Sequence, residues 1–300
     1  MDTSMAYLLG MITGNGIVRR ENDKTTVTID IPHKKEQTET DENVITYVKA
    51  SITDIRGVID PLLGTNCRFV AGNSRSTLSF TLSNDEYVMK EILRILSGAT
   101  SHENVRISPE VFSFTTDERK SFLRGIADVT GYIRKSNCYI EPGSHRVYIE
   151  VPQNWWLAVD ICNLLKSVDI PVQNVNWSHP NMRDGNLKEY KRGKPLAWKK
   201  ENQIKIYANE FQPIGFTIEH KQKALDYFID EETQIFNSRP HRKSLEEKTH
   251  KYYWESVVKR GKAKPIHPCE NDESIPEEIR GQHFDTWQEI ADALGYNEMS

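Results

Sequence analysis

Two stretches of the chain alternate apolar and polar residues with a period of two. They read TTVTIDI at residues 25–31 and HRVYIEV at residues 145–151, and this alternation predicts half-buried β-strands. One face of each strand is apolar and faces a core, while the other offers donors and acceptors. The polar faces carry Thr26, Thr28 and Asp30 in the first strand and Arg146, Tyr148 and Glu150 in the second.

Helical patterns and further strands accompany these two strands in the same order in each half of the chain. Each half therefore reads αββαββα, and we expect its first helix to end at a glycine in the left-handed conformation. A basic insertion at residues 181–200 separates the last two strands of the second half. The predicted helices cover 4–13, 42–63 and 85–96, then 117–129, 155–169 and 219–236, with added strand pairs at 67–82 and 172–208.

An internal repeat matches this order. Residues 8–20 read LLGMITGNGIVRR and residues 123–135 read LRGIADVTGYIRK, an offset of 115. A second match, IDIP at 29–32 against IEVP at 149–152, follows at an offset of 120. Repeats fix architecture, so we predict an α+β fold of two tandem repeats with antiparallel sheets. The expected divisions are a first repeat at 1–105, a second at 106–236 and a helical C-terminal extension at 237–300.

Charge is distributed unevenly along the chain. The net charge of the 300 residues is -4, but residues 266–300 carry nine acids and one base, which leaves +4 for the remainder. Residues 237–265 hold nine bases against three acids. Basic segments permit phosphate binding, although many such segments are simply solvated surface. The four cysteines form no CxxC pair, which fits a reduced compartment, and no apolar run is long enough to predict a membrane span.

The repeated helix resembles the signature of a known family. The stretches LLGMITGNG (8–16) and SFLRGIADVTGYI (121–133) resemble the signature helix of the LAGLIDADG homing endonucleases. The resemblance covers roughly residues 1–236, and two copies about 115 residues apart are what a single-chain, pseudo-twofold member would show. It implies two signature helices packed side by side, with glycines at the third and ninth positions allowing close approach. Those positions hold Gly10, Gly16, Gly125 and Gly131.

The resemblance also implies a function for the two sheets, which in this family form a saddle over the major groove of duplex DNA. Carboxylates such as Asp30 and Glu150 could accept hydrogen bonds from cytosine, and Arg146 could read guanine. The alternative is an ordinary solvated sheet face. The residues expected to bind DNA are Thr26, Thr28, Asp30, Arg146, Tyr148, Glu150, Lys188, Lys191, Arg192, Lys199 and Lys205.

The chain departs from the family where cleavage would occur. In active members the eighth signature position is normally an acid that holds divalent metal, whereas here it is Asn15 and Thr130, which bind magnesium poorly. Asp128 stands at the sixth position, and His33 and Gln153 align just after the long strand of each half. A supporting lysine is not found near the last strand of either half.

Three explanations of these departures stay open. Cleavage is lost while the scaffold is kept, which we favour; or both positions were deliberately changed; or Asp30 and Glu150 hold metal in a rearranged site. We therefore expect no resident cofactor, and Mg²⁺ only if the protein is catalytically active. The spacing of histidines and cysteines predicts no other metal centre.

The C-terminal extension lies outside the resemblance. Its basic, aromatic first part suits phosphate and base contacts, or an amphipathic helix that docks on its own domain. The second part is acidic, which argues against a DNA-reading helix and favours a protein partner. The apolar side chains expected to face a core in this part are Ile279, Phe284, Trp287, Ile290 and Leu294.

Together these patterns predict an intracellular, cytoplasmic monomer, associated with the nucleoid if prokaryotic. We expect sequence-specific binding of double-stranded DNA, with cleavage lost, as in the recognition component of a restriction or regulatory system. The alternative is an active, divalent-metal-dependent DNA endonuclease with an altered site. A protein-interaction scaffold that uses the acidic segment is a third reading.

Overall fold

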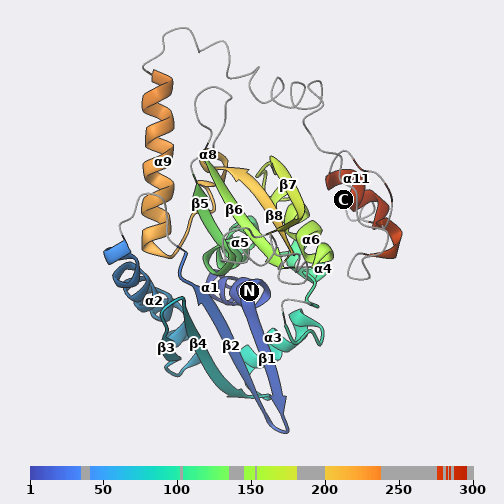
Figure 1. Cartoon of the computed structure of the whole chain (residues 1–300). Helices are drawn as coiled ribbons and strands as arrows, with labels where there is room; N and C mark the ends of the chain where they lie inside the picture. Colours follow the sequence, from blue (N-terminus) through green and yellow to red (C-terminus); the bar gives the residue numbers. More distant parts are fainter. Residues whose placement is uncertain are drawn as a thin grey trace, which may run out of the picture.

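The computed structural model describes two halves with the same order of elements, followed by a short C-terminal segment (Figure 1). The residues it describes are 1–34, 41–101, 104–134, 145–152, 154–180, 200–237, 276–279, 282, 284 and 287–295. The first half consists of α1 (Thr3–Asn15), β1 (Gly16–Glu21), β2 (Lys24–Pro32), α2 (Asp41–Leu63), β3 (Arg68–Ala71), β4 (Arg75–Ser83) and α3 (Tyr87–Leu96).

The second half repeats this order after the short helix α4 (Pro109–Phe112). The repeat of αββαββα confirms the fold class, and the boundaries of the long helices and strands agree with the sequence pattern to within a few residues. Its elements are α5 (Thr116–Thr130), β5 (Gly131–Arg134), β6 (Arg146–Pro152), α6 (Trp155–Lys166), β7 (Asn174–Pro180), β8 (Lys200–Tyr207), α8 (Ala208–Phe211) and α9 (Glu219–Asn237).

Each half contributes one antiparallel, four-stranded sheet. The strand orders are β1-β2-β4-β3 and β5-β6-β8-β7, so each strand has a counterpart at the same place in the other sheet. The registers match as well, because Asp30 lies opposite Thr77 in the first sheet and Glu150 lies opposite Gln203 in the second. The sequence repeat at residues 29–32 and 149–152 is therefore a repeat of the second strand of each sheet.

Helices α1 and α5 pack side by side between the two sheets (Figure 1). Their backbones approach so closely that a Cβ atom on Gly10 would lie 1.9 Å from the Phe122 carbonyl oxygen. A Cβ atom on Gly125 would lie 2.2 Å from the Tyr7 carbonyl oxygen. Only glycine fits these two positions without moving a backbone, and the contact joins the two halves into one body.

The glycines that end these two helices serve a different purpose from the expected one. Gly16 and Gly131 have φ of -101° and -91°, so both are extended rather than left-handed. A Cβ atom on Gly16 would lie 2.5 Å from the Ile12 carbonyl oxygen, and one on Gly131 would lie 2.6 Å from that of Ala127. Glycine is needed here for space, because the chain turns from helix directly into strand.

The inner faces of both sheets form one hydrophobic core with the helices. The alternation in the sequence places every second side chain of β2 and β6 in this core. No helix among the described residues is long and apolar enough to cross a membrane. The buried side chains of these two strands are Val27, Ile29 and Ile31 in the first and Val147, Ile149 and Val151 in the second.

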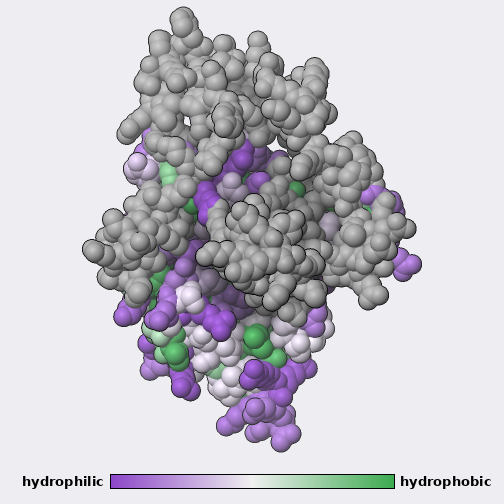
Figure 2. All heavy atoms as spheres, in the orientation of Figure 1, coloured by the Kyte–Doolittle hydropathy of each residue, from purple (hydrophilic) through white to green (hydrophobic). Residues whose placement is uncertain are grey.

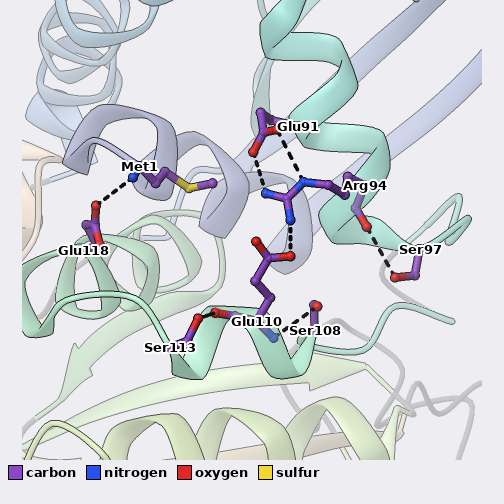
Figure 3. A network of polar contacts seen from close by, with 8 residues as sticks. All are labelled: Met1, Glu91, Arg94, Ser97, Ser108, Glu110, Ser113 and Glu118. Carbon is purple, nitrogen blue, oxygen red and sulfur yellow. Dashed lines mark hydrogen bonds and ion pairs between the residues drawn. The ribbon is translucent and has the colours of Figure 1, made fainter.

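A network of charges ties the start of the chain and the end of the first half to the second half (Figure 3). Arg94, in the last turn of α3, pairs with Glu91 on its own helix and with Glu110 on α4. The amino group of Met1 lies 3.3 Å from a carboxylate oxygen of Glu118 on α5. The pairs made by Arg94 are partly exposed and contribute modestly to stability, whereas the Met1–Glu118 pair is largely buried, with side chains 6% and 11% exposed.

The described part of the acidic segment packs against the second half. It contains the single-turn helix η2 (Glu277–Ile279) and α11 (Trp287–Ala293), and α11 contacts α6. Four of the apolar residues expected to face a core do so, and the side chain of Trp287 lies outside the described residues. The four buried residues are Ile279, Phe284, Ile290 and Leu294.

Candidate nucleic-acid interface

The outer face of the first sheet is rich in hydroxyl groups. Thr26, Thr28 and Asp30 lie on it, as the alternation predicts, and all three are partly exposed. Thr81 of β4 lies opposite Thr26, and their hydroxyl oxygens are 2.8 Å apart. Two hydrophobic side chains join this face from the edge strands: Ile17 of β1 and Val70 of β3, which are 38% and 50% exposed.

Positive charge frames this hydroxyl face. Arg19 of β1 lies opposite Thr26 of β2, and Arg68 of β3 lies opposite Ser79 of β4. Both arginines are exposed. The tip of the β1–β2 hairpin, residues 21–24, is also exposed, and Figure 2 shows this end of the molecule as strongly hydrophilic. A face of this composition presents donors and acceptors in its centre and cations at its edges.

Asp30 is held by neighbours within its own sheet. Its carboxylate accepts a hydrogen bond from the Thr77 hydroxyl at 2.8 Å and forms an ion pair with Arg75 at 3.0 Å. Its backbone carbonyl accepts from the Asn15 side-chain amide at 2.8 Å. Asn15 therefore ties the end of α1 to β2. Its side-chain amide donates a hydrogen bond there, whereas an acidic side chain at this position could only accept one.

The outer face of the second sheet carries tyrosine rings where the first sheet carries threonine and serine side chains. Tyr132 of β5 and Tyr148 of β6 stack with ring centroids 5.2 Å apart and planes 5° apart. Basic side chains lie over the tyrosines of this sheet at cation–π distances. The cation-to-centroid distances are 5.1 Å for Arg134 over Tyr132, 5.7 Å for Lys205 over Tyr148 and 5.7 Å for Arg146 over Tyr207.

Two of the predicted contact residues on this second face are more covered than the alternation alone implies. Arg146 and Glu150 share the face with Tyr148, but they are only 8% and 9% exposed. Tyr148 and Lys205 are partly exposed. Of the predicted residues on this sheet, Tyr148 and Lys205 are therefore the ones the structure makes most accessible.

Glu150 takes part in a contact between the two halves. Its carboxylate accepts from the Gln203 amide at 3.1 Å and pairs with the ammonium of Lys34, which follows β2 in the first half. Lys34 also reaches the Thr130 carbonyl oxygen at 3.5 Å and lies 4.6 Å from the centroid of Tyr132. Burial raises the pKa of the Glu150 carboxyl, but Lys34 and the hydrogen bonds outweigh it, so the pKa lies below its ordinary value.

The two eighth signature positions both act as hydrogen-bond donors. The Thr130 hydroxyl donates to the Ile126 carbonyl oxygen of its own helix at 2.7 Å, while Asn15 donates to Asp30 as described. The outer-face carboxylates Asp30 and Glu150 are paired with Arg75 and Lys34. No group of three histidine, cysteine or carboxylate residues in the described ranges could hold a metal ion. The side chains at this junction therefore do not fit a divalent cation.

Asp128 has a structural position. It is fully buried and accepts hydrogen bonds from the Tyr7 hydroxyl at 2.7 Å and from the backbone amides of Thr217 and Ile218 at 3.1 and 3.3 Å. Burial raises its pKa although the buried Lys221 opposes the shift. This network fastens α5 to α1 and to the residues that directly precede α9.

Of the remaining predicted site residues, only His33 lies within the described part of the chain. The His33 ring nitrogen Nε2 lies 2.7 Å from the Ser76 hydroxyl, and burial lowers the pKa of the ring, so it stays neutral near pH 7. His33 thus lies at the end of β2, on the first half's side of the junction. The predicted residues that fall outside the described ranges are Gln153, Lys188, Lys191, Arg192 and Lys199.

Lys34 is the important residue that the sequence pattern did not single out. The family resemblance implies a supporting lysine near the last strand of each half, but the sequence has Ser83-Asn84 and Ala208-Asn209 at those places. The available signal was weak: a lysine directly after His33 at the end of a strand. Its partner Glu150 is 116 residues away, and only the packing of the two halves brings them together.

Among the comparisons with known proteins, only those with solved structures give matches. No family model matches the chain, and no curated protein sequence does. The solved structures that the chain matches include LAGLIDADG homing endonucleases, with TM-scores below 0.5. The structure of I-DmoI in complex with DNA and Mn is 16% identical, with a TM-score of 0.39 over 70% of this chain and 93% of that one.

Two other solved structures show similar values. The LAGLIDADG meganuclease I-AabMI bound to uncleaved DNA is 10% identical, with a TM-score of 0.42 over 78% of this chain and 92% of its own. The I-LtrWI LAGLIDADG homing endonuclease bound to target DNA is 10% identical, with a TM-score of 0.39 over 77% and 91%. What these proteins bind is a property of theirs, and the chemistry of this chain depends on its own side chains.

Proposed function

We propose that this protein binds double-stranded DNA sequence-specifically through the outer faces of its two sheets. The observation that carries the proposal is the pair of polar sheet faces, equivalent in topology and held on one central helix pair. Two faces on one chain can contact two successive half-sites, so a monomer suffices. The signature resemblance in the sequence points to the same partner.

The two faces differ in the contacts they can make. The hydroxyls around Thr26 and Thr28 and the Asp30–Arg75 pair suit direct reading of base edges in the major groove. The exposed Ile17 and Val70 suit thymine methyl groups. On the second face the basic residues over tyrosine rings, such as Lys205 over Tyr148, suit phosphate contacts that fix register.

We propose further that the protein binds without cutting, as the recognition component of a restriction or regulatory system would. The side chains at the helix junction donate hydrogen bonds or are paired, so no metal-held water is expected there. The competing function, an endonuclease with a rearranged metal site, would require Asp30 to leave Arg75 and Glu150 to leave Lys34. That cost makes binding without cleavage the better-supported function.

Selection from random duplexes followed by gel-shift titration tests both parts. We expect one recovered site with two unlike halves, bound with an affinity that falls steeply as salt rises, because phosphate contacts release counterions. No sequence-selective binding at moderate salt would overturn the proposal. Incubation of the selected site with Mg²⁺ or Mn²⁺ is expected to leave it intact. Cleavage that Asp30→Asn or Glu150→Gln abolishes would show an enzyme instead.

For the acidic segment we propose a protein contact separate from the DNA faces. Its apolar side is buried in the second half, while Glu277, Glu278 and Asp292 stay exposed. These carboxylates suit a basic protein surface and would repel phosphate. Replacing the three by Gln, Gln and Asn is expected to leave selective DNA binding intact. Loss of binding in this variant would place the segment within the DNA site.

A further inference from the structure

The junction of the two signature helices carries an electrostatic problem that the helices themselves do not solve. Helices α1 and α5 each run directly into a strand, so their carbonyl ends meet the edge of the two sheets. The carbonyl end of a helix carries partial negative charge and is stabilised by a nearby cation. Neither of these two described helices has a basic residue in its last turn.

The buried Lys221 donates to the Asp128 carbonyl oxygen of α5 at 2.7 Å, and Lys34 adds a second, partly exposed ammonium from outside both helices. Its ammonium lies 3.5 Å from the Thr130 carbonyl oxygen, at the end of α5, and pairs with Glu150. An ammonium has three protons to donate, and these two oxygens account for two of them. The Lys34 side chain keeps 26% of its surface exposed, so its charge is accessible beside the sheet faces.

An anionic partner can bind beside Glu150 only if Lys34 neutralises the Glu150 carboxylate. The carboxylate is 9% exposed and lies on the outer face of β6. A bare carboxylate in this position would repel a phosphate, whereas a carboxylate neutralised by Lys34 would not. Asp30 is neutralised in the first half by Arg75 of its own sheet, whereas Glu150 of the second half is neutralised by Lys34 of the first.

We propose that Lys34 is the solvent-accessible cation of the helix junction and that its ammonium binds a backbone phosphate between the two half-sites, so that DNA binding needs no divalent metal. The inference rests on the proposed function. In the free protein Glu150 and Thr130 hold the ammonium in place. In the complex its remaining proton is donated to the phosphate, and no bond other than hydrogen bonds is made or broken.

The test is the affinity for the selected duplex in EDTA and in Mg²⁺, measured across a range of salt concentrations. Wild-type protein is expected to bind equally well in both. Lys34→Met is expected to bind roughly tenfold more weakly in EDTA, with a salt slope lower by about 0.9. Glu150→Gln, which releases the ammonium, is expected to bind more tightly than wild type. Lys90→Met, an exposed lysine on α3 away from both faces, is the matched control and should bind as wild type does.

Each outcome separates this inference from the proposed function. Wild type that binds selectively only with Mg²⁺ would overturn the inference and leave the proposed function standing. An unchanged affinity and salt slope in Lys34→Met would do the same. Should Lys34→Met fail to fold, Glu150→Gln decides, and the absence of tighter binding would overturn the inference. Wild type that binds no duplex selectively under any condition would overturn both.

Discussion

The two sheets share a strand order and a register but have unlike outer faces. In the first, residues that lie opposite one another are hydroxyls, as with Thr26 and Thr81. In the second, the outer face carries stacked tyrosines under basic side chains, as with Tyr148 and Lys205. The inner faces stay alike because both must pack on the same helix pair. The comparison teaches that packing on the helices constrains the inner face of each sheet, whereas it leaves the two outer faces able to carry unlike side chains.

The helix ends differ in a related way. Asn15 bonds across to β2, whereas Thr130 bonds back to its own helix at Ile126. Asp30 is neutralised within its own half and Glu150 by the other half. The second half therefore depends on the first for the charge balance of its face. A target bound by such a molecule should have two unlike halves.

The largest expected effect is at the helix contact, where the halves are most alike. Gly10→Ala and Gly125→Ala should each destabilise the fold by about 3 kcal/mol or more, because the added Cβ atom would overlap a carbonyl oxygen of the facing helix. Urea denaturation measures this as a lower free energy of unfolding. Gly57→Ala in α2 is the control, since nothing lies within 4 Å of its Cβ position, and it should stabilise by up to about 1 kcal/mol. A tolerated change at only one of the two glycines would show that the contact is not equivalent in the two halves.

A smaller effect is expected from matched substitutions on the two outer faces. Tyr148→Ala should weaken DNA binding by about 1–3 kcal/mol through loss of an aromatic surface, and Thr28→Ala by about 1 kcal/mol through loss of one hydrogen bond. The two positions correspond in the repeat. Repeating the duplex selection with each variant should alter base preference in different half-sites. Changes in the same half-site would break the comparison, and Tyr227→Ala, exposed on α9, should change neither.

The smallest effect concerns pH and the pair that joins the halves. The pKa of Glu150 is lowered in the folded protein, so its pair with Lys34 contributes stability above the ordinary glutamate pKa of about 4.3. That contribution is lost as pH falls through the lowered folded value. Unfolding free energies measured between pH 7 and pH 3 should fall less on acidification in Glu150→Gln than in wild type. An identical pH dependence would mean that the pair does not stabilise the fold.

Much of the fold follows from the sequence because its signals are local. The period of two in residues 25–31 predicts β2 to within one residue at each end, and the repeated glycines indicate the helix contact. The extended conformation of Gly16 and Gly131 is different, because helix ends usually need a left-handed glycine, and only the direct passage into a strand removes that need.

The site was less predictable because its contacts join distant parts of the chain. The alternation places Glu150 on an outer face but cannot show that Lys34 covers it. The signature suggests a helix-end role for Asp128, and its partners Tyr7 and Thr217 emerge only from packing. Ion pairs between halves depend on how the halves meet, which no local pattern encodes.

The glycine contact between α1 and α5 also fixes the distance between the two sheets. With carbonyl oxygens of one helix filling the space beside the glycines of the other, the two sheets have no room to slide or rotate apart. Under the proposed function, the molecule would act as a ruler of fixed span: it would tolerate changed bases within a half-site, but not one base pair added between the halves. Grafting new sheet residues onto this frame would then change the DNA sequence that is bound and leave the spacing as it is.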